Sequence, residues 1–473
     1  MGKTISRSSS PRLAVIQVDG VSRKHLDQAL DRGLVPHLKE RVDSGKLHLD
    51  TYNTGLPSQT TVAIGGLLYG KMLPGNQWFD KKTQSVVDTF HAGNAAEVAQ
   101  SLAVQGGGIA QGGSVYVSPL DGGAQADESF FVLSDMGRVS KEKGKWGLVK
   151  SVVSEFAELA THLVTHPVRA VQSAAHFASE VAHDLRHRHQ THRSLKTTLV
   201  DAMKESFISD AASHRIADQI RRGDAPYVYL DLANFDARSH SFGAGEKAFE
   251  TLPYVDKNLD VILDAVEESD TGYQVAILAD HGSATGYPFH KLYGKTLQDL
   301  SAELAPNNEV VALDFGSGAH VYLKDQPGQL DRSELPDRLR DGLRNQPGIA
   351  FTVTRQEGKT LIESRHGSVS VSDDGTEIEG KNPLDDFEED TQLTARQLHD
   401  MMFREGAGDI LVFGELHGDG LVNFSTHHKG LHGGIGLEQT RPFVAWSDGL
   451  HLEPGKTEDA ADLHTQFEAY LER

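Results

Sequence analysis

Short, continuous apolar runs constrain the fold of this chain more than any other feature. Three of them are LAVIQV at Leu13–Val18, YVYLDL at Tyr227–Leu232 and VAILA at Val275–Ala279, and PFVAW at Pro442–Trp446 is a fourth candidate. Continuous rather than alternating apolar strands are typical of a parallel sheet that is buried on both faces. Helix-like segments separate the runs, as at residues 25–42. We therefore predict an α/β fold with a mostly parallel central sheet sandwiched by helices.

Residues of the types that bind metals follow these runs. Asp19-Gly20 comes directly after the first run, and Asp280-His281-Gly282 comes directly after the third. Because ligands bind at the carboxyl ends of the strands in open parallel sheets, these side chains are expected to converge. Any one of the candidates alone could be a turn or a helix cap, but together they could hold two ions. They are three carboxylates and three imidazoles: Asp19, Asp236, Asp280, His240, His281 and His432.

Two of these candidates depend on spacing rather than on a strand end. Asp236 and His240 stand four residues apart, which places both side chains on one face of a helix. Alone, such a pair is more often an N-cap aspartate and an exposed histidine. His432 lies before the fourth run and is followed by two glycines.

The segment PSQT at 57–60 precedes a run of small and apolar residues. A hydroxyl residue at this place indicates a helix N-terminus, where backbone N–H groups point at a bound anion. A metal ion could activate Thr60 as a nucleophile without a neighbouring base. The alternative is that Ser58 or Thr60 is merely an N-cap.

Composition excludes several classes of function. With 46 basic and 67 acidic residues the net charge is −21, so nucleic-acid binding through a basic surface is not expected. The absence of cysteine excludes disulfides and thiolate sites, which leaves histidine and carboxylate ligands for a metal. No apolar run reaches 18 residues, so we expect no transmembrane segment and a soluble, cytoplasmic chain. A periplasmic or secreted location would follow if a leader was removed.

The chain is too long for one compact core, and two segments differ from the rest. Residues 140–222 carry helical apolar stripes and many histidines, including the run His187–His192, and predict a helical insertion. Residues 326–412 contain alternating stretches at Ile349–Thr354 and Ser368–Val371, and then an acidic run at Asp385–Asp390, expected as a solvated loop. They predict a smaller α+β insertion. The core then comprises 10–139, 223–325 and 413–473.

The ordered motifs VDG, PSQT separated by nine residues from Gly70, FDARSH, ADHG and HGG resemble those of the alkaline phosphatase superfamily. Within it, they are most similar to the nucleotide pyrophosphatase/phosphodiesterase branch. The match is proline-anchored at Pro57, which places the nucleophile at Thr60 rather than Ser58. Ser58, Tyr69 and Ser239 depart from the family pattern, but none is a predicted ligand.

The resemblance implies two divalent metal ions, with zinc favoured and manganese or iron as alternatives. One ion would be held by Asp19, Asp280, His281 and Thr60, and the other by Asp236, His240 and His432. The segment GNQWFD suggests Asn76 as a contact to the phosphoryl oxygen. The implied activity is hydrolysis of a small phosphate ester through a phosphothreonine at Thr60.

Some alternatives remain open at this stage. A phosphomonoesterase or phosphonate monoester hydrolase would use the same centre, and Arg238 could then clamp the extra phosphate charge. A catalytically silent metal-binding module is a more distant alternative. His427 and His428 could compete with His432, although the HGG context favours His432. Histidines between residues 162 and 192 are expected at the surface rather than in a third metal site, and the helical insertion could mediate homo-oligomerisation.

Overall fold

The computed structural model describes residues 10–104, 106–125, 129–186, 195–387 and 390–473. Its central sheet has six strands in the order β2-β19-β7-β1-β6-β5. β1 pairs in parallel with both β6 and β7, and β19 runs antiparallel to β7 and β2. The mostly parallel sheet is therefore confirmed. The strands are β1 (Arg12–Val18), β2 (Leu47–Thr51), β5 (Ser114–Tyr116), β6 (Tyr227–Leu232), β7 (Tyr273–Leu278) and β19 (Phe443–Ser447).

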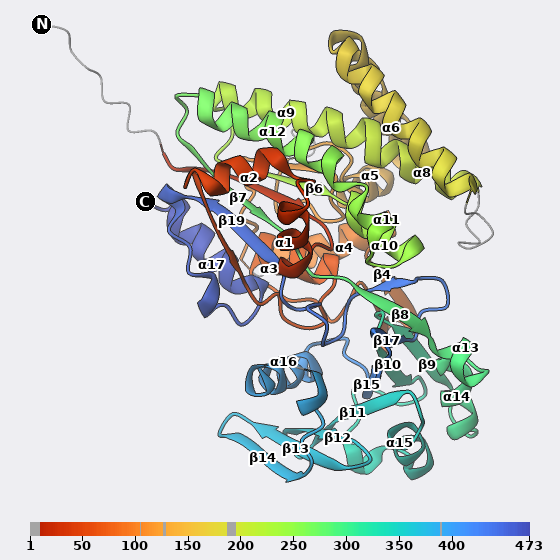
Figure 1. Cartoon of the computed structure of the whole chain (residues 1–473). Coiled ribbons are helices and arrows are strands. Elements are labelled where there is room, and N and C mark those ends of the chain that lie inside the picture. The colour runs from red at the N-terminus through yellow and green to blue at the C-terminus, as the bar shows by residue number, and fades with distance from the viewer. Residues whose placement is uncertain (1–9, 105, 126–128, 187–194, 388–389) are drawn as a thin grey trace, which may run out of the picture.

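Helices cover both faces of this sheet (Figure 1). Along β1, Ala14 and Ile16 join one hydrophobic core while Leu13 and Val15 join the other, because successive side chains of a strand point to opposite faces. One core includes α1 (Arg23–Asp31), α2 (Pro36–Asp43), α9 (Ser209–Arg222) and α12 (Leu252–Glu268). The other includes α3 (Thr60–Tyr69), α4 (Ala92–Val104) and α17 (Ala460–Leu471).

The helix predicted at residues 25–42 is in fact two helices, α1 and α2. Gly33 adopts φ +66°, a left-handed conformation that ends α1, and Pro36 opens α2 at its first turn. The apolar spacing continued across the break because both helices bury leucines in the same core. The apolar periodicity therefore did not reveal the break between the two helices.

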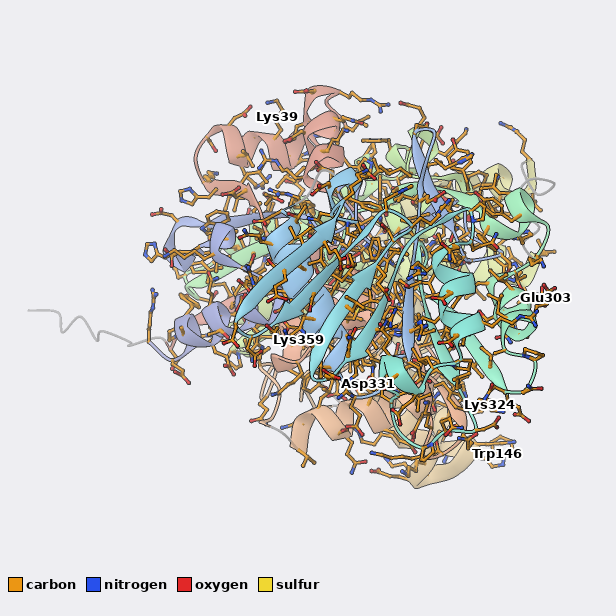
Figure 2. The ribbon with its side chains drawn as sticks, turned by 90° about the horizontal axis from the view of Figure 1, so that it is seen from below. Lys39, Trp146, Glu303, Lys324, Asp331 and Lys359 are labelled. Carbon is orange, nitrogen blue, oxygen red and sulfur yellow. The ribbon has the colours of Figure 1, made fainter. Side chains whose placement is uncertain are left out.

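The predicted helical insertion consists of α5 (Leu133–Thr165), α6 (Pro167–Arg186), α8 (Leu195–Met203) and a π-helical turn, η1 (Lys204–Ile208), which leads into α9. In Figure 1, α6 and α8 extend away from the central sheet. Gly144 kinks α5, and Pro167 starts α6. Trp146 of α5 is 80% exposed and lies at the margin of the molecule in Figure 2. The histidine run 187–192 lies outside the described residues.

A second sheet of seven strands, in the order β14-β13-β12-β11-β15-β10-β9, forms the lower lobe in Figure 1 and the foreground of Figure 2. Its pairings are antiparallel. β11 and β13 correspond to the two alternating stretches, whereas β9 and β10 precede residue 326. The strands are β9 (Val310–Asp314), β10 (Gly318–Leu323), β11 (Ile349–Gln356), β12 (Lys359–Glu363), β13 (Gly367–Ser372), β14 (Gly375–Gly380) and β15 (Ile410–Gly414).

Helices α14 (Leu297–Leu304), α15 (Asp337–Arg344) and α16 (Thr391–Phe403) pack against this sheet. The acidic run is not simply a solvated loop. Its first part is a 3-10 turn at Asp385–Phe387, with Phe387 buried, and Asp390 caps α16 by accepting hydrogen bonds from the backbone of Gln392 and Leu393. A single apolar residue and a cap thus tie the run to the core.

A small sheet, β16 (Leu416–His417), β17 (Gly420–Asn423), β8 (Ala284–Pro288) and β18 (Gly430–Leu431), lies between the two larger ones. β8 follows the DHG motif and pairs with β18, which precedes His432. Residues 145 and 147 positions apart in the sequence, Thr285 with Gly430 and Ala284 with Leu431, are thereby paired. No helix among the described residues is both long enough and apolar enough to cross a membrane.

Candidate active site

The ends of β1 and β7 bring the first group of predicted ligands together. Nε2 of His281 lies 3.4 Å from Oδ1 of Asp19 and 3.3 Å from Oδ2 of Asp280. Directly after Asp19 the chain turns at Gly20, which has φ +79° and donates its N–H to Oδ1 of Asp280 at 3.2 Å. A Cβ at Gly20 would lie 2.8 Å from that of Asp236, so glycine also permits the close approach of the second group.

The second group comes from α10 (Asn234–Phe242) and the segment after β18. Asp236 lies in the first turn of α10 and His240 in its last, and their Oδ2 and Nε2 atoms are 3.0 Å apart. His432 places Nε2 3.3 Å from Nε2 of His240 and 4.0 Å from Oδ1 of Asp236. The ring of His432 also stacks on His281 at 3.7 Å, so the two groups are contiguous.

In all three histidines, Nδ1 lies within hydrogen-bond distance of a backbone carbonyl oxygen. The Nδ1 atoms of His240, His281 and His432 lie 3.1, 3.2 and 3.1 Å from the carbonyl oxygens of Gly430, Gly282 and Ser58. With Nδ1–H donating to a carbonyl, Nε2 carries the lone pair and faces the site. Such outer hydrogen bonds fix the tautomer and orientation of histidines that bind metals.

The carboxylates of the site fit divalent cations. Oδ1 of Asp19, Oδ1 of Asp236 and Oδ2 of Asp280 are buried without a hydrogen-bond partner, which is costly for a charged group. Burial and the charges of Asp280 and Asp236 raise the pKa of Asp19 well above its usual range. Burial and the nearby His281 lower the pKa of His432 well below its usual range, so its imidazole is neutral. This mixture of nitrogen and oxygen donors is suited to zinc.

Thr60 is the first residue of α3, a helix whose ten residues are all buried. Its Oγ1 lies 3.2 Å from Nε2 of His281 and lines the same cleft as the predicted ligands. Ser58 lies two residues earlier and has a structural contact instead: its Oγ donates to Gly434 O and accepts from Gly433 N. From the sequence, either Ser58 or Thr60 could be a helix cap. In the structure, Ser58 Oγ contacts backbone, whereas Thr60 Oγ1 lies next to His281.

Asn76 also lines the cleft. Its Oδ1 accepts hydrogen bonds from the backbone N–H of Thr61 at 3.0 Å and from Thr61 Oγ1 at 2.6 Å. Its own backbone N–H donates to Oε1 of Gln59 at 2.9 Å. With the amide oxygen occupied in this way, the NH₂ group is the part of Asn76 left to contact a ligand.

His320 of β10 ties the second sheet to the segment that carries Asn76. Its Nε2 lies 2.9 Å from Pro74 O, and its Nδ1 accepts from Gly408 N at 3.1 Å, so the buried ring is neutral. Burial lowers its pKa from 6.5 to about 4. The unfolded chain therefore binds a proton between these values that the folded chain does not, and stability present above pH 6.5 is lost as pH falls towards 4.

We expect the stability advantage of the wild type over His320→Gln to shrink by about 3 kcal/mol between pH 7 and pH 4. Urea unfolding of EDTA-treated protein at both pH values measures it. His91→Gln, at an exposed histidine, is the matched control for the loss of an imidazole. An equal pH dependence in His320→Gln and the wild type would contradict the role of His320.

A cleft of about 1120 Å³ that extends to the helical insertion is lined by Asp19, Thr60, Asn76, Asp236, His240 and His432. Asp280 and His281 are fully buried and are not part of its lining. One wall is apolar and aromatic, with Phe90, Phe131 and Phe156 among its side chains. Lys204, in the π-helical turn η1, is the one lysine or arginine among the described residues that line it. Lys204 belongs to no motif in the sequence. The feature that marks it is the π-helical turn in which it lies, because such turns are frequent at functional sites.

Two further residues near the site differ from the sequence analysis. Arg238 pairs with Glu180 of α6 and is absent from the described lining of the cleft, so it does not form the phosphate clamp. His428, treated there as a competitor of His432, lines the cleft and places its ring 4.0 Å from that of His240. The arginine instead ties the helical insertion to α10.

The expectation of surface histidines in the 162–192 region is wrong at His162 and His176. The side chain of His162 is 8% exposed and lies 2.8 Å from Asp210, and His176 stacks on Tyr254 at 3.9 Å. Both lie where helices of the insertion pack on α9 or α12. Their partners are distant in the sequence, which a local pattern does not reveal.

A family model described as the metalloenzyme superfamily matches residues 152–289, which include Asp236, His240, Asp280 and His281. Phosphonoacetate hydrolase from Sinorhizobium meliloti 1021, solved with phosphonoformate, has a similar structure, with a TM-score of 0.53, 16% identity and coverage of 98% of this chain and 95% of that one. The chain therefore shares the fold of that hydrolase. The family-model match and this likeness agree with the resemblance that the motifs indicate.

A second similar structure is murine ectonucleotide pyrophosphatase/phosphodiesterase 5, solved as an inactive variant with AMP. Its TM-score is 0.52 at 10% identity, and the match covers 98% of this chain and 95% of that one. At these identities the likeness concerns the fold. A comparison with curated protein sequences finds no match.

Proposed function

We propose that this chain is a two-metal-dependent phosphoric ester hydrolase of the phosphodiesterase type, which forms a phosphothreonine at Thr60. The observation that carries the proposal is the position of Thr60 Oγ1, 3.2 Å from His281, at the N-terminus of a buried helix and beside both ligand groups. The metalloenzyme family match supports the metal dependence. The two similar structures, by their names, belong to a phosphonate hydrolase and a nucleotide phosphodiesterase.

The residues of the chain would divide the work as follows. Asp19, Asp280 and His281 would hold one divalent ion next to Thr60, and Asp236, His240 and His432 the other. When bound, the two ions supply Lewis-acid stabilisation of the charge on phosphorus and lower the pKa of a hydroxyl group. Thr60 attacks phosphorus, the ester oxygen leaves, and water then hydrolyses the phosphothreonine. Asn76 would donate its NH₂ group to a phosphoryl oxygen, as a preformed donor.

The aromatic wall of the cleft favours a diester. Phe90, Phe131 and Phe156 offer apolar surface to the second ester group, which a monoester lacks. The exclusion of Arg238 from the cleft lining removes the clamp suggested for a monoester. Lys204 is the observation that favours the second candidate, a monoesterase, because it could pair with an additional negative charge on the substrate.

An assay with zinc or manganese separates the candidates on a generic aryl phosphodiester, an aryl phosphomonoester and an aryl phosphonate monoester. We expect kcat/KM for the diester to exceed that for the monoester by about tenfold or more, a difference of about 1.4 kcal/mol. Faster turnover of the monoester would favour the second candidate. No turnover of any substrate by the metal-loaded protein would favour the silent module.

Lys204→Met tests the charge specificity of the cleft. For a dianionic monoester we expect kcat/KM to fall about tenfold, because the loss of one partly buried cation next to a charge costs about 1–2 kcal/mol. For the diester we expect a change of less than about twofold. Phe90→Leu serves as a matched change at an apolar residue of the lining and should weaken turnover of the diester instead. Equal losses for both esters in Lys204→Met would contradict the role.

The proposed partner is a small phosphorylated molecule, and the acidic surface opposes nucleic acid. Homo-oligomerisation through the helical insertion remains part of the proposal. It is supported by large apolar side chains exposed on α5 and α6, such as Trp146, Val164 and Val171. We also keep the cytoplasmic location as a proposal.

A further inference from the structure

A second cluster of ligand-type side chains lies in the helical insertion, apart from the catalytic residues. It is formed by His162, His166, Asp210 and His214. His162 lies in the last turn of α5 and His166 caps it, while Asp210 and His214 lie on α9. Each helix therefore contributes one pair of residues four apart, and these pairs face each other.

The ring and carboxylate distances bring His162, Asp210 and His214 to one point, and the ring of His166 packs beside them. His162 Nε2 lies 2.8 Å from Oδ2 of Asp210, and His214 Nδ1 lies 3.8 Å from Oδ1 of the same carboxylate. The ring centroids of His162, His166 and His214 are 4.5 to 5.0 Å apart in all three pairs. One ligand atom each from His162, Asp210 and His214 fall within 4.8 Å of one another.

Two of the histidines are oriented like those of the catalytic centre. Nδ1 of His166 lies 3.3 Å from His162 O, and Nδ1 of His214 lies 3.0 Å from Asp210 O. Donation from Nδ1–H to these carbonyls leaves the Nε2 lone pairs for a ligand.

An ordinary buried ion pair explains this cluster less well. A single His162–Asp210 pair would need one histidine, yet two imidazoles lie next to the Asp210 carboxylate and the ring of His166 packs against both of them. His162, Asp210 and His214 would supply three ligands and the adjacent His166 a fourth, and together they would make a complete tetrahedral shell for zinc, which is typical of a structural site. The Asp210/His214 spacing is also the same as that of Asp236/His240 in the proposed catalytic centre.

We propose that His162, His166, Asp210 and His214 bind a structural zinc ion that joins α5 to α9. α5 contributes Phe156 to the lining of the cleft, six residues before His162, and η1, which leads into α9, contributes Ile208, two residues before Asp210. The ion would therefore brace the insertion against the central domain at the mouth of the cleft. This site does not depend on the proposed reaction.

Zinc content tests the proposal. The protein is stripped with EDTA, reloaded with zinc alone, desalted and analysed by mass spectrometry of the metal. We expect about three zinc ions per chain in the wild type and one fewer in the double variant His166→Ala/His214→Ala. The variant replaces the two more exposed histidines of the cluster. His48→Ala, an exposed histidine elsewhere, is the matched control and should keep the full content. Equal zinc contents in the double variant and the wild type would overturn the proposal.

A second background separates this site from the catalytic one and does not require the double variant to fold. In Asp236→Ala/Asp280→Ala, which disrupts both predicted catalytic ions, we expect one zinc to be retained and the melting temperature to rise on addition of zinc. Cobalt in its place should give the intense visible absorption of a tetrahedral site. A chain that binds no zinc in this background would overturn the proposal, whatever the outcome of the hydrolysis assays.

Discussion

Replacing Thr60 with alanine is expected to lower kcat by a factor on the order of 10⁴ or more, the effect of removing a nucleophile that has no substitute. Thr60 Oγ1 lies 3.2 Å from His281 Nε2, at the N-terminus of α3. The metal content should remain close to that of the wild type, because Asp19, Asp280 and His281 are unchanged. Single-turnover assays and metal analysis of the same preparation measure both quantities.

Thr60→Ser is the matched control, since it keeps the hydroxyl and removes only a methyl group. It should retain much more activity than Thr60→Ala, and acid quenching during turnover should yield phosphate on residue 60 in the wild type. Thr60→Ala with activity near that of the wild type would rule out the nucleophile. A simultaneous loss of metal in Thr60→Ala would instead assign the hydroxyl mainly to metal binding.

Replacing Asp280 with asparagine is expected to remove about one metal ion per chain and to lower kcat/KM about 10³-fold, equivalent to about 4 kcal/mol of transition-state stabilisation. Asp280 is fully buried, and its Oδ2 has no hydrogen-bond partner. The stability of the protein should change in opposite directions with and without metal. Metal analysis, and melting temperatures in zinc and in EDTA, measure the effects.

The opposite signs have one cause. In EDTA the charge of Asp280 raises the pKa of Asp19, so asparagine should stabilise the metal-free chain by about 1–3 kcal/mol. In zinc it should destabilise the protein, because a ligand is lost. Asp231→Asn is the matched control: burial raises the pKa of Asp231 to about 8, but it is not a predicted ligand. Loss of metal in Asp231→Asn, or full metal content in Asp280→Asn, would contradict the assignment.

The sequence predicted the central sheet well because its strands are buried on both faces. Leu13–Val18, Tyr227–Leu232 and Val275–Ala279 coincide closely with β1, β6 and β7. A strand that packs against helices on both sides must be apolar along its whole length, so consecutive residues are enough to recognise it in the sequence. The helix predicted at residues 25–42 failed for the converse reason, since a left-handed glycine broke it without changing the apolar spacing.

The predicted site residues were found by two kinds of signal. Asp19, Asp280 and His281 follow from the rule that strand ends form the site. The structure places Nε2 of His281 within 3.4 Å of a carboxylate oxygen of each aspartate. Asp236, His240 and His432 depended more on motif resemblance. His432 is 192 residues from His240, and the pairing of β18 with β8 and the bridge between Ser58 and Gly433 bring it to the site.

The sequence by itself determined the α/β architecture, the exclusion of cysteine ligands and the choice of carboxylates and imidazoles at strand ends. These are local properties of residue type and order. Only the tertiary structure decided that Arg238 pairs with Glu180, that Lys204 faces the cleft and that His162 meets Asp210. These contacts depend on how the helical insertion packs against α9, α10 and α12. That packing is set by shape and burial across the fold, which no short pattern encodes.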